Sequence, residues 1–355
     1  MEIIDAPSLS KMMPVIMNDQ FERLAVIDDY NSFIWSTRYY TSGDFQLMLD
    51  VNEKNMNLIQ KDYFVVRDDD ENVGIIEDIM IQRNEDAHEV LIVKGRFLDA
   101  IIARRIIAVQ TTVSGKISAC IEQLLDENII NPSIAARQIA NFTIDSYEVS
   151  TTMQAQYTGK NLLDTISTIC KTYGIGYKVT LNDEYEFVFQ LYEGTDRTYD
   201  QNVNPWVVFS DTYDNLLSSQ YEENYKNIAT AVLVAGEGEG LDRKTAWVTD
   251  GSTGLDRHEV YKDQRNIQSN DGEITEEEYM DLLEESGKES LTKYTTAFTG
   301  TVYFDSITYK QDINVGDLCV IENSRWGIYL NTRLVEVIES VNEAGEYSIT
   351  PTFGV

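Results

Sequence analysis

Residues 35–49 read Trp35-Ser-Thr-Arg38-Tyr39-Tyr40-Thr-Ser-Gly43-Asp-Phe45-Gln-Leu47-Met-Leu49. After Gly43, large apolar residues recur at every second position, which is the period of a β-strand with one buried face. The aromatic residues before Gly43 favour β structure as well. This run therefore predicts strands joined by a tight turn, and the sequence around it repeats the same design.

Short apolar runs separated by polar turns continue on both sides of this stretch. Residues 1–13 have only a weak pattern and are expected to form an arm that ends at Pro14. From Val15 to about Ala108, the spacing of about 8–12 residues between strand signals is typical of a small β-barrel or sandwich. We assign residues 14–111 to this first barrel. Its predicted turns are 28–31, 67–72 and 84–87, and its further strands are Val26–Ile27, Ser32–Tyr40, Tyr63–Val66, Gly74–Ile76, Ile79–Ile81 and Val90–Val93.

The hydrophobic period becomes that of a helix between residues 112 and 205. Two stripes have i, i+3, i+4, i+7 spacing and predict helices with a buried face. Gly174 ends the second helix, and a hairpin is predicted from Tyr177–Thr180 and Tyr185–Tyr192. Residues 112–205 are therefore predicted to be an α+β domain. The stripes are Ile117, Cys120, Ile121, Leu124, Leu125 and Asn128, then Leu162, Leu163, Ile166, Ile169, Cys170 and Tyr173.

Strands return after Trp206 and run to the end of the chain. Residues 240–297 interrupt them as a polar, helical insertion, in which Thr275-Glu-Glu-Glu278 has the form of a capping box. The predicted fold class is α+β and dominated by β. Two β-barrels flank the α+β domain, and residues 206–355 form the second barrel from strands within 206–239 and 298–355. These strands are Val207–Phe209, Thr230–Ala235, Thr301–Phe304, Leu318–Ile321, Ile328–Tyr329, Arg333–Glu339 and Tyr347–Thr350.

The charge of the chain disfavours nucleic acid as a bound partner. The 28 Lys and Arg against 60 Asp and Glu give 28 − 60 = −32 over 355 residues. So acidic a protein repels the phosphate backbone, although a soluble acidic surface explains the excess equally well. The start of the chain has neither a basic nor an apolar segment of a signal peptide, and no stretch is long and apolar enough to span a bilayer. We expect synthesis in a reducing cytoplasm.

The sequence offers no convincing catalytic, cofactor-binding or metal-binding residues, and none is predicted. The Gly236–Gly240 run has the wrong spacing for a phosphate-binding loop, and its glutamates would oppose a phosphate. Asp68–Asn72 resembles a calcium loop but lacks the glycine and glutamate of an EF-hand; we interpret it as a solvated hairpin tip, with a different calcium site as the alternative. His88 and His258 have no local signature that joins them to a cysteine.

Two further possibilities stay open from the residues alone. Trp35, Tyr39 and Tyr40 could stack against a sugar, although alternating aromatics on a strand are more often core. With 60 acids, some pair of carboxylates always has the separation used in glycoside hydrolysis, so this criterion decides little. The cysteines Cys120, Cys170 and Cys319 are odd in number and form no CxxC motif, which predicts neither a disulfide framework nor a zinc site.

The order of several segments resembles the tail-hub proteins of tailed bacteriophages, in particular the siphovirus Gp37-like group of tail-tip proteins. The resemblance covers residues 14–355. It is carried by structural motifs, namely Trp35-x-x-Arg38-Tyr39-x3-Gly43-x-Phe45-x-Leu47, Gly74-Ile75-Ile76-Glu77, Val93-Lys94-Gly95-Arg96-x-Leu98, Gly316-Asp317, Arg333–Val337 and Tyr347–Gly354.

The resemblance implies a non-enzymatic structural protein of the virion tail tip. Both barrels would be tail-tube-like, so that three subunits form a pseudo-six-fold ring that joins the tail tube or distal tail protein to the tip. A homotrimer, the tape-measure protein and receptor-binding tip proteins are the implied partners. DNA would only pass through, and carboxylates in the channel would keep it from sticking. The chain would be the bare hub. The alternative is a tail protein that degrades or binds cell-wall or capsular polysaccharide.

Overall fold

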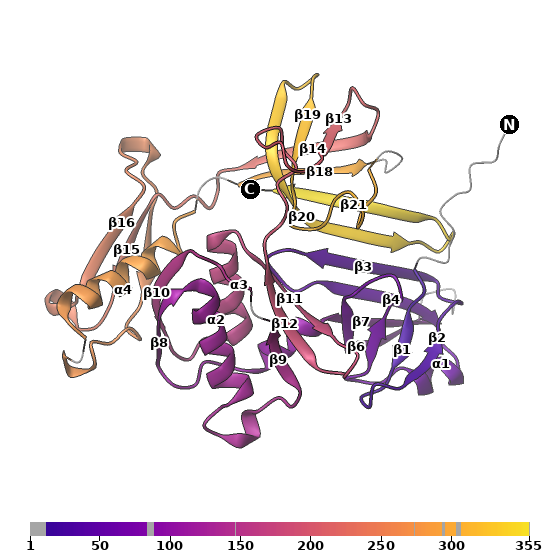
Figure 1. Cartoon of the computed structure of the whole chain (residues 1–355), viewed down its shortest axis with the longest axis horizontal. Helices are drawn as coiled ribbons and strands as arrows, with labels where there is room; N and C mark the ends of the chain where they lie inside the picture. Colours follow the sequence, from indigo (N-terminus) through magenta and orange to yellow (C-terminus); the bar gives the residue numbers. More distant parts are fainter. Residues whose placement is uncertain are drawn as a thin grey trace.

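The computed structural model describes residues 12–83, 89–145, 147–272, 274–292, 295–302 and 307–354. The protein is mostly β, as the sequence predicts, with helices concentrated in the middle of the chain. Thirteen strands form one large sheet in the order β14-β18-β21-β20-β3-β4-β7-β6-β5-β1-β2, and β13 and β19 extend it beside β20. In Figure 1 the N-terminal strands (indigo) and the C-terminal strands (yellow) lie against each other across the pair β20 and β3.

The N-terminal part contributes seven strands to the large sheet. The hairpin of β3 and β4 contains the run 35–49 and places Trp35 opposite Phe45. Gly43 lies where a Cβ atom would be 2.3 Å from the Phe97 ring, so a larger residue does not fit there. The elements are β1 (Val15–Met17), β2 (Arg23–Val26), β3 (Ser32–Arg38), β4 (Asp44–Asp50), α1 (Glu53–Leu58), β5 (Phe64–Val66), β6 (Val73–Arg83), β7 (Glu89–Phe97) and a 3₁₀ helix (Leu98–Arg104).

The middle part combines helices with two small sheets. Both predicted stripes form helices that bury their apolar face. The Asn161 side chain caps the second helix, and Gly174 ends it in the left-handed conformation at φ 73°. The predicted hairpin is also present. The elements are β8 (Thr111–Lys116), α2 (Ile117–Leu125), a π-helical turn (Asp126–Ile130), β9 (Phe142–Asp145), β10 (Thr152–Tyr157), α3 (Leu162–Tyr173), β11 (Gly176–Leu181) and β12 (Phe187–Tyr192).

The C-terminal part also contributes strands to the large sheet, and a separate group of elements lies between two of these strands in the sequence. The elements of the large sheet are β13 (Val208–Ser210), β14 (Leu216–Asn224), β18 (Thr295–Val302), β19 (Leu318–Asn323), β20 (Ile328–Val341) and β21 (Tyr347–Gly354). Between β14 and β18 lie β15 (Ala231–Ala235), β16 (Thr245–Thr249), β17 (Glu259–Asp263) and α4 (Glu276–Lys288). Figure 1 shows this group, which we call the small subdomain, at the end of the molecule farthest from β1 and β2.

Two expectations about the barrels need correction. No closed barrel occurs among the described residues, because the strands predicted for two barrels join in one open sheet. The physical reason is β20: it is 14 residues long and pairs with β19, β21 and β3. The Arg38 guanidinium on β3 donates to Glu336 on β20 at 2.6 Å, and this cross-strand ion pair supports the join.

The strand predicted at residues 230–235 belongs to the small subdomain instead of the second barrel. β15 pairs with β16 and β17, and α4 packs its apolar face on this three-stranded sheet. The capping box is confirmed: the Thr275 side chain accepts from the Glu278 amide, and the Glu278 carboxylate accepts from the Thr275 amide. The insertion thus has its own hydrophobic core. The predicted domain boundaries remain predictions.

Candidate functional site

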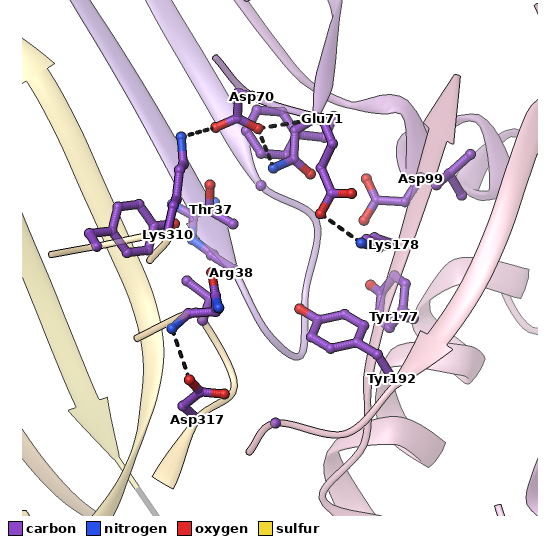
Figure 2. A pocket seen from close by; sticks show the side chains of 18 of the residues that line it. Thr37, Arg38, Asp70, Glu71, Asp99, Tyr177, Lys178, Tyr192, Lys310 and Asp317 are labelled. Atoms are coloured by element: carbon purple, nitrogen blue, oxygen red, sulfur yellow. Dashed lines mark hydrogen bonds and ion pairs between the residues drawn. The ribbon is translucent and has the colours of Figure 1, made fainter. Parts of the chain in front are cut away.

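The candidate site is a cavity that lies where the N-terminal, middle and C-terminal parts of the chain meet. It has a volume of about 510 Å³. Figure 2 shows side chains from all three parts converging on it. We call it the junction cavity. The lining residues used below are Arg38, Asp69, Asp70, Glu71, Asp99, Tyr177, Lys178, Tyr192, Glu193, Gly194, Lys310 and Asp317.

Local structure explains how these residues reach one place. Residues 67–72 form the turn between β5 and β6, and Asp69, Asp70 and Glu71 of this turn line the cavity. Tyr177 and Lys178 lie on β11, and Tyr192 ends β12. Gly194 approaches Gly316 so closely that a Cβ atom would lie 1.7 Å from the Gly316 carbonyl oxygen, so glycine is required for the two segments to touch.

One buried ion pair joins the N-terminal turn to β20. Arg67 donates through two nitrogens to the Glu339 carboxylate at 3.1 and 3.2 Å, and to Asp69 at 2.6 and 3.0 Å. Its guanidinium also lies 5.7 Å from the centre of the Trp35 ring. Burial by itself would lower the pKa of Arg67, but the two carboxylates outweigh it and raise the pKa above its ordinary value.

Two lysines continue the network into the cavity. The Lys310 ammonium donates to Asp70 at 2.6 Å and to Glu339 at 3.1 Å, and the Asp70 side chain is only 1% exposed. Lys178 on β11 donates to Glu71 at 2.6 Å. The pairs of Glu71 with Lys178 and of Asp70 with Lys310 join residues that are 107 and 240 positions apart in the sequence. They therefore fix the turn 67–72 between the other two parts of the chain.

Asp68–Asn72 is the tip of the hairpin of β5 and β6, as predicted, and Asp68, Asp69 and Glu71 are exposed there. The structure adds that the Asp70 side chain is buried and that the acids are paired. Each of its acids meets a cation: Asp68 meets Arg23, Asp69 meets Arg67, Asp70 meets Lys310 and Glu71 meets Lys178. Within the part of the chain that the structure describes, no group of three or more histidine, cysteine or acidic residues has a geometry suited to a metal ion. The cluster acts as an ion-pairing turn.

Asp317 performs a similar task beside the Gly194 contact. Its carboxylate accepts from the Thr195 amide at 2.7 Å, from the Arg197 guanidinium at 2.8 Å and from the Asn314 amide at 3.0 Å. It is buried. Gly316-Asp317 was one of the motifs that carry the family resemblance, and the structure shows that its carboxylate is buried and ties two segments together.

Asp99 differs from the other acids of the cavity. It lies in the 3₁₀ helix after β7 and is 4% exposed. Burial raises the pKa of Asp99 to about 6, although a hydrogen bond from the Ser42 hydroxyl and the positive charge of Arg96 oppose the shift. Asp99 was not among the residues singled out from the sequence. The available signal was a single acid inside the apolar run Leu98-Asp-Ala-Ile-Ile102.

Other candidates from the sequence lie outside any site. Trp35 and Tyr39 are fully buried, so they form core and no sugar platform. Gly236–Gly240 connects β15 to β16, where Glu237 accepts from the Ser269 amide. His88 lies outside the described residues. His258 precedes β17 and uses its backbone carbonyl to accept from Thr230 and Ala231.

The three cysteines are buried free thiols, and burial raises their pKa. A raised pKa disfavours the thiolate that a nucleophile needs. No helix among the described residues has the length and apolar character to cross a membrane. The junction cavity itself presents mainly charged groups: ion pairs that hold three segments of the chain, and two carboxylates, Asp99 and Glu193, outside these pairs.

A comparison with protein families places the whole folded region in one group. The family model described as Siphovirus ReqiPepy6 Gp37-like protein matches residues 14–355. No curated protein sequence matches the chain.

Several solved structures share the fold. A tail protein from Neisseria meningitidis MC58 has a TM-score of 0.55 at 12% identity, covering 97% of this chain and 96% of that one. The 43 kDa tail protein of prophage MuSo2 from Shewanella oneidensis has a TM-score of 0.55 at 12% identity, with 96% and 97% covered. Prophage tail protein gp18 from Listeria monocytogenes EGD-e has a TM-score of 0.52 at 11% identity, with 97% and 94% covered. At such identities the likeness establishes the fold alone.

Proposed function

Because the chain belongs to the family of Siphovirus ReqiPepy6 Gp37-like proteins, we propose that it is a structural protein of a bacteriophage tail tip. The observation that carries this proposal is the extent of the matches. The family model spans residues 14–355, and the tail proteins of similar fold are covered almost from end to end. The likeness therefore extends over nearly the whole fold of these tail proteins, and the proposed role is non-enzymatic.

The proposed assembly is a homotrimeric hub ring at the distal end of the tail. Strands from the N-terminal and C-terminal parts would line the ring, joined within each subunit by the β20–β3 pair. The ring would contact the tail tube or distal tail protein on one side, and the tape-measure and receptor-binding tip proteins would be further partners. The ion pairs around the junction cavity support this role, because they stiffen the connection between the parts that must keep their relative position.

DNA passage gives the acidic composition a proposed role. Carboxylates that face the centre of the ring would repel DNA and keep it from binding as it passes. Replacing those carboxylates by neutral amides should slow DNA ejection from assembled particles. An unchanged ejection rate would contradict the proposal that these carboxylates repel DNA. It would leave the proposal of a trimeric ring unaffected.

Mass and shape in solution test the ring directly. Light scattering after size-exclusion chromatography should give a species of about 120 kDa, from 3 × 40.5 kDa, and negative-stain images should show rings with a central opening. The measurement is best made with the distal tail protein present, because neighbours stabilise assembled subunits by mass action. A monomer that remains a monomer with this partner would contradict the proposal.

The alternative of a polysaccharide-degrading or polysaccharide-binding tail protein is tested in parallel. Purified protein is incubated with peptidoglycan and with capsular polysaccharide, and released sugars and retained protein are measured. The structural role predicts neither release nor retention. Release of sugar would show that the role is enzymatic.

A further inference from the structure

The junction cavity contains more acid than its own cations neutralise. Six carboxylates line it: Asp69, Asp70, Glu71, Asp99, Glu193 and Asp317. Four of them are held by Arg67, Lys310, Lys178 and Arg197. Within the described parts of the chain, Asp99 and Glu193 make no ion pair. Glu193 is exposed and accepts from the Tyr147 hydroxyl at 3.0 Å, whereas Asp99 is 4% exposed.

Arg96, whose charge acts on Asp99, and the cavity-lining Arg38 and Lys178 are each paired with other carboxylates. Arg96 on β7 binds Glu77 through two nitrogens at 2.8 Å. Lys178 on β11 binds Glu71. Arg38, on β3, binds Asp44 and Glu336, each at 2.6 Å. Moving any of these cations to Asp99 would break an existing pair. The buried Asp99 carboxylate thus has a hydrogen bond from the Ser42 hydroxyl and the nearby charge of Arg96, but no ion pair of its own among the described residues.

The cavity has the room and the acceptors for a ligand that supplies this charge. Its volume of about 510 Å³ lies in the range of ligand pockets, roughly 300–1,000 Å³. Figure 2 shows Asp99 and Tyr192 facing the same space. The Tyr192 hydroxyl has no hydrogen-bond partner among the described residues, and its ring already lies 5.6 Å from one ammonium group, that of Lys178.

We propose that the junction cavity binds a primary ammonium group, with the Asp99 carboxylate as its counter-ion and the Tyr192 hydroxyl as a second acceptor. An ammonium carries three N–H donors and one positive charge, which matches a charged acceptor beside a neutral one. The group can come from a free amine or from a lysine side chain of a partner protein. This site does not depend on the tail-tip role and would exist in an isolated subunit.

Calorimetric titration of the full chain tests the site with three probes at constant ionic strength. Methylammonium chloride represents a free amine, and Nα-acetyl-lysine amide represents a partner's lysine. Tetramethylammonium chloride carries the same charge without N–H donors. At pH 7.5 we expect saturable binding of at least one primary amine, and much weaker binding of tetramethylammonium. Binding of the lysine amide would identify a partner lysine as the source, and binding of methylammonium alone a free amine.

Asp99→Asn should weaken the bound amine about tenfold or more, because a charged acceptor is replaced by a neutral one of the same shape. Asp281→Asn makes the same change on the exposed face of α4 and should leave binding unchanged. Thermal melting confirms that both variants fold. The proposal is overturned if neither primary amine binds saturably, if Asp99→Asn binds as tightly as the unaltered chain, or if tetramethylammonium binds equally well.

Discussion

The carboxylates of the junction and those on the outer face of helix α4 are chemically alike but lie in opposite surroundings. Glu339 is 4% exposed and accepts hydrogen bonds from Arg67, Lys310 and Tyr347. Glu277, Asp281 and Glu284 are exposed along α4. All of them count equally in the net charge of −32. Their contributions to stability should differ widely, because the free energy of a buried charge depends on its partners far more than that of a solvated charge does.

The largest effect is expected at Glu339. Glu339→Ala removes a buried carboxylate that pairs with the buried Arg67, and it also removes one of the two carboxylates that Lys310 contacts. Removing one member of a buried ion pair typically costs about 3–5 kcal/mol of unfolding free energy. We therefore expect a loss of about 4 kcal/mol in urea unfolding.

The matched control on α4 is Glu284→Ala, whose side chain is exposed. Its unfolding free energy should stay within about 0.5 kcal/mol of the unaltered chain. Equal losses in the two variants would show that burial and pairing at the junction do not set its stability, and the contrast between the two regions would then be wrong.

The second-largest effect is expected at Asp99, where replacing the carboxylate should raise the unfolding free energy instead of lowering it. Burial raises the pKa of Asp99 from 3.8 to about 6, so the folded state holds this proton more tightly than the unfolded state. The stability that the group contributes is full below pH 3.8 and is lost as the pH rises through 6. Asp99→Asn avoids that loss. With two pKa units at 1.36 kcal/mol each, the variant should be more stable by about 3 kcal/mol at pH 7.5.

Urea unfolding of Asp99→Asn and of the unaltered chain at several pH values measures how this stability difference depends on pH. The difference in unfolding free energy should shrink between pH 6 and pH 4 and vanish below that range. The other carboxylates titrate in both proteins, so they cancel in the difference. Asp281→Asn should show no such trend. A pH-independent difference at Asp99 would mean that its carboxyl is compensated in the fold.

The sequence predicted elements well where the hydrophobic period was local. Both helical stripes, the hairpin of β11 and β12, and the capping box of α4 depend on residues close together in the chain. Strand partners were harder. Ile328–Tyr329 and Arg333–Glu339 were predicted as two strands, whereas β20 runs unbroken through both. Its three partners lie in distant segments, and alternation along one strand contains no information about them.

The site was predictable only in part, for the same reason. Asp68–Asn72 drew attention as a cluster of acids, but its cations Lys178 and Lys310 are more than 100 residues away. Nothing near Asp70 in the sequence shows that its side chain is buried. Asp99, in contrast, was detectable as a lone acid among apolar residues, because such a residue is seldom buried without a reason.

The smallest effect is expected within α4, where one exposed carboxylate, that of Glu278, has a structural role. Glu278 accepts from the Thr275 amide, and the Thr275 hydroxyl accepts from the Glu278 amide. Thr275→Ala removes one half of this capping box and should lower the unfolding free energy by about 1 kcal/mol. The loss should appear as faster hydrogen exchange in the first turn of α4, with the amides of β3 and β20 unchanged, because the small subdomain has its own core. Faster exchange throughout the large sheet would show that the small subdomain and the junction unfold together, and that their carboxylates do not act separately.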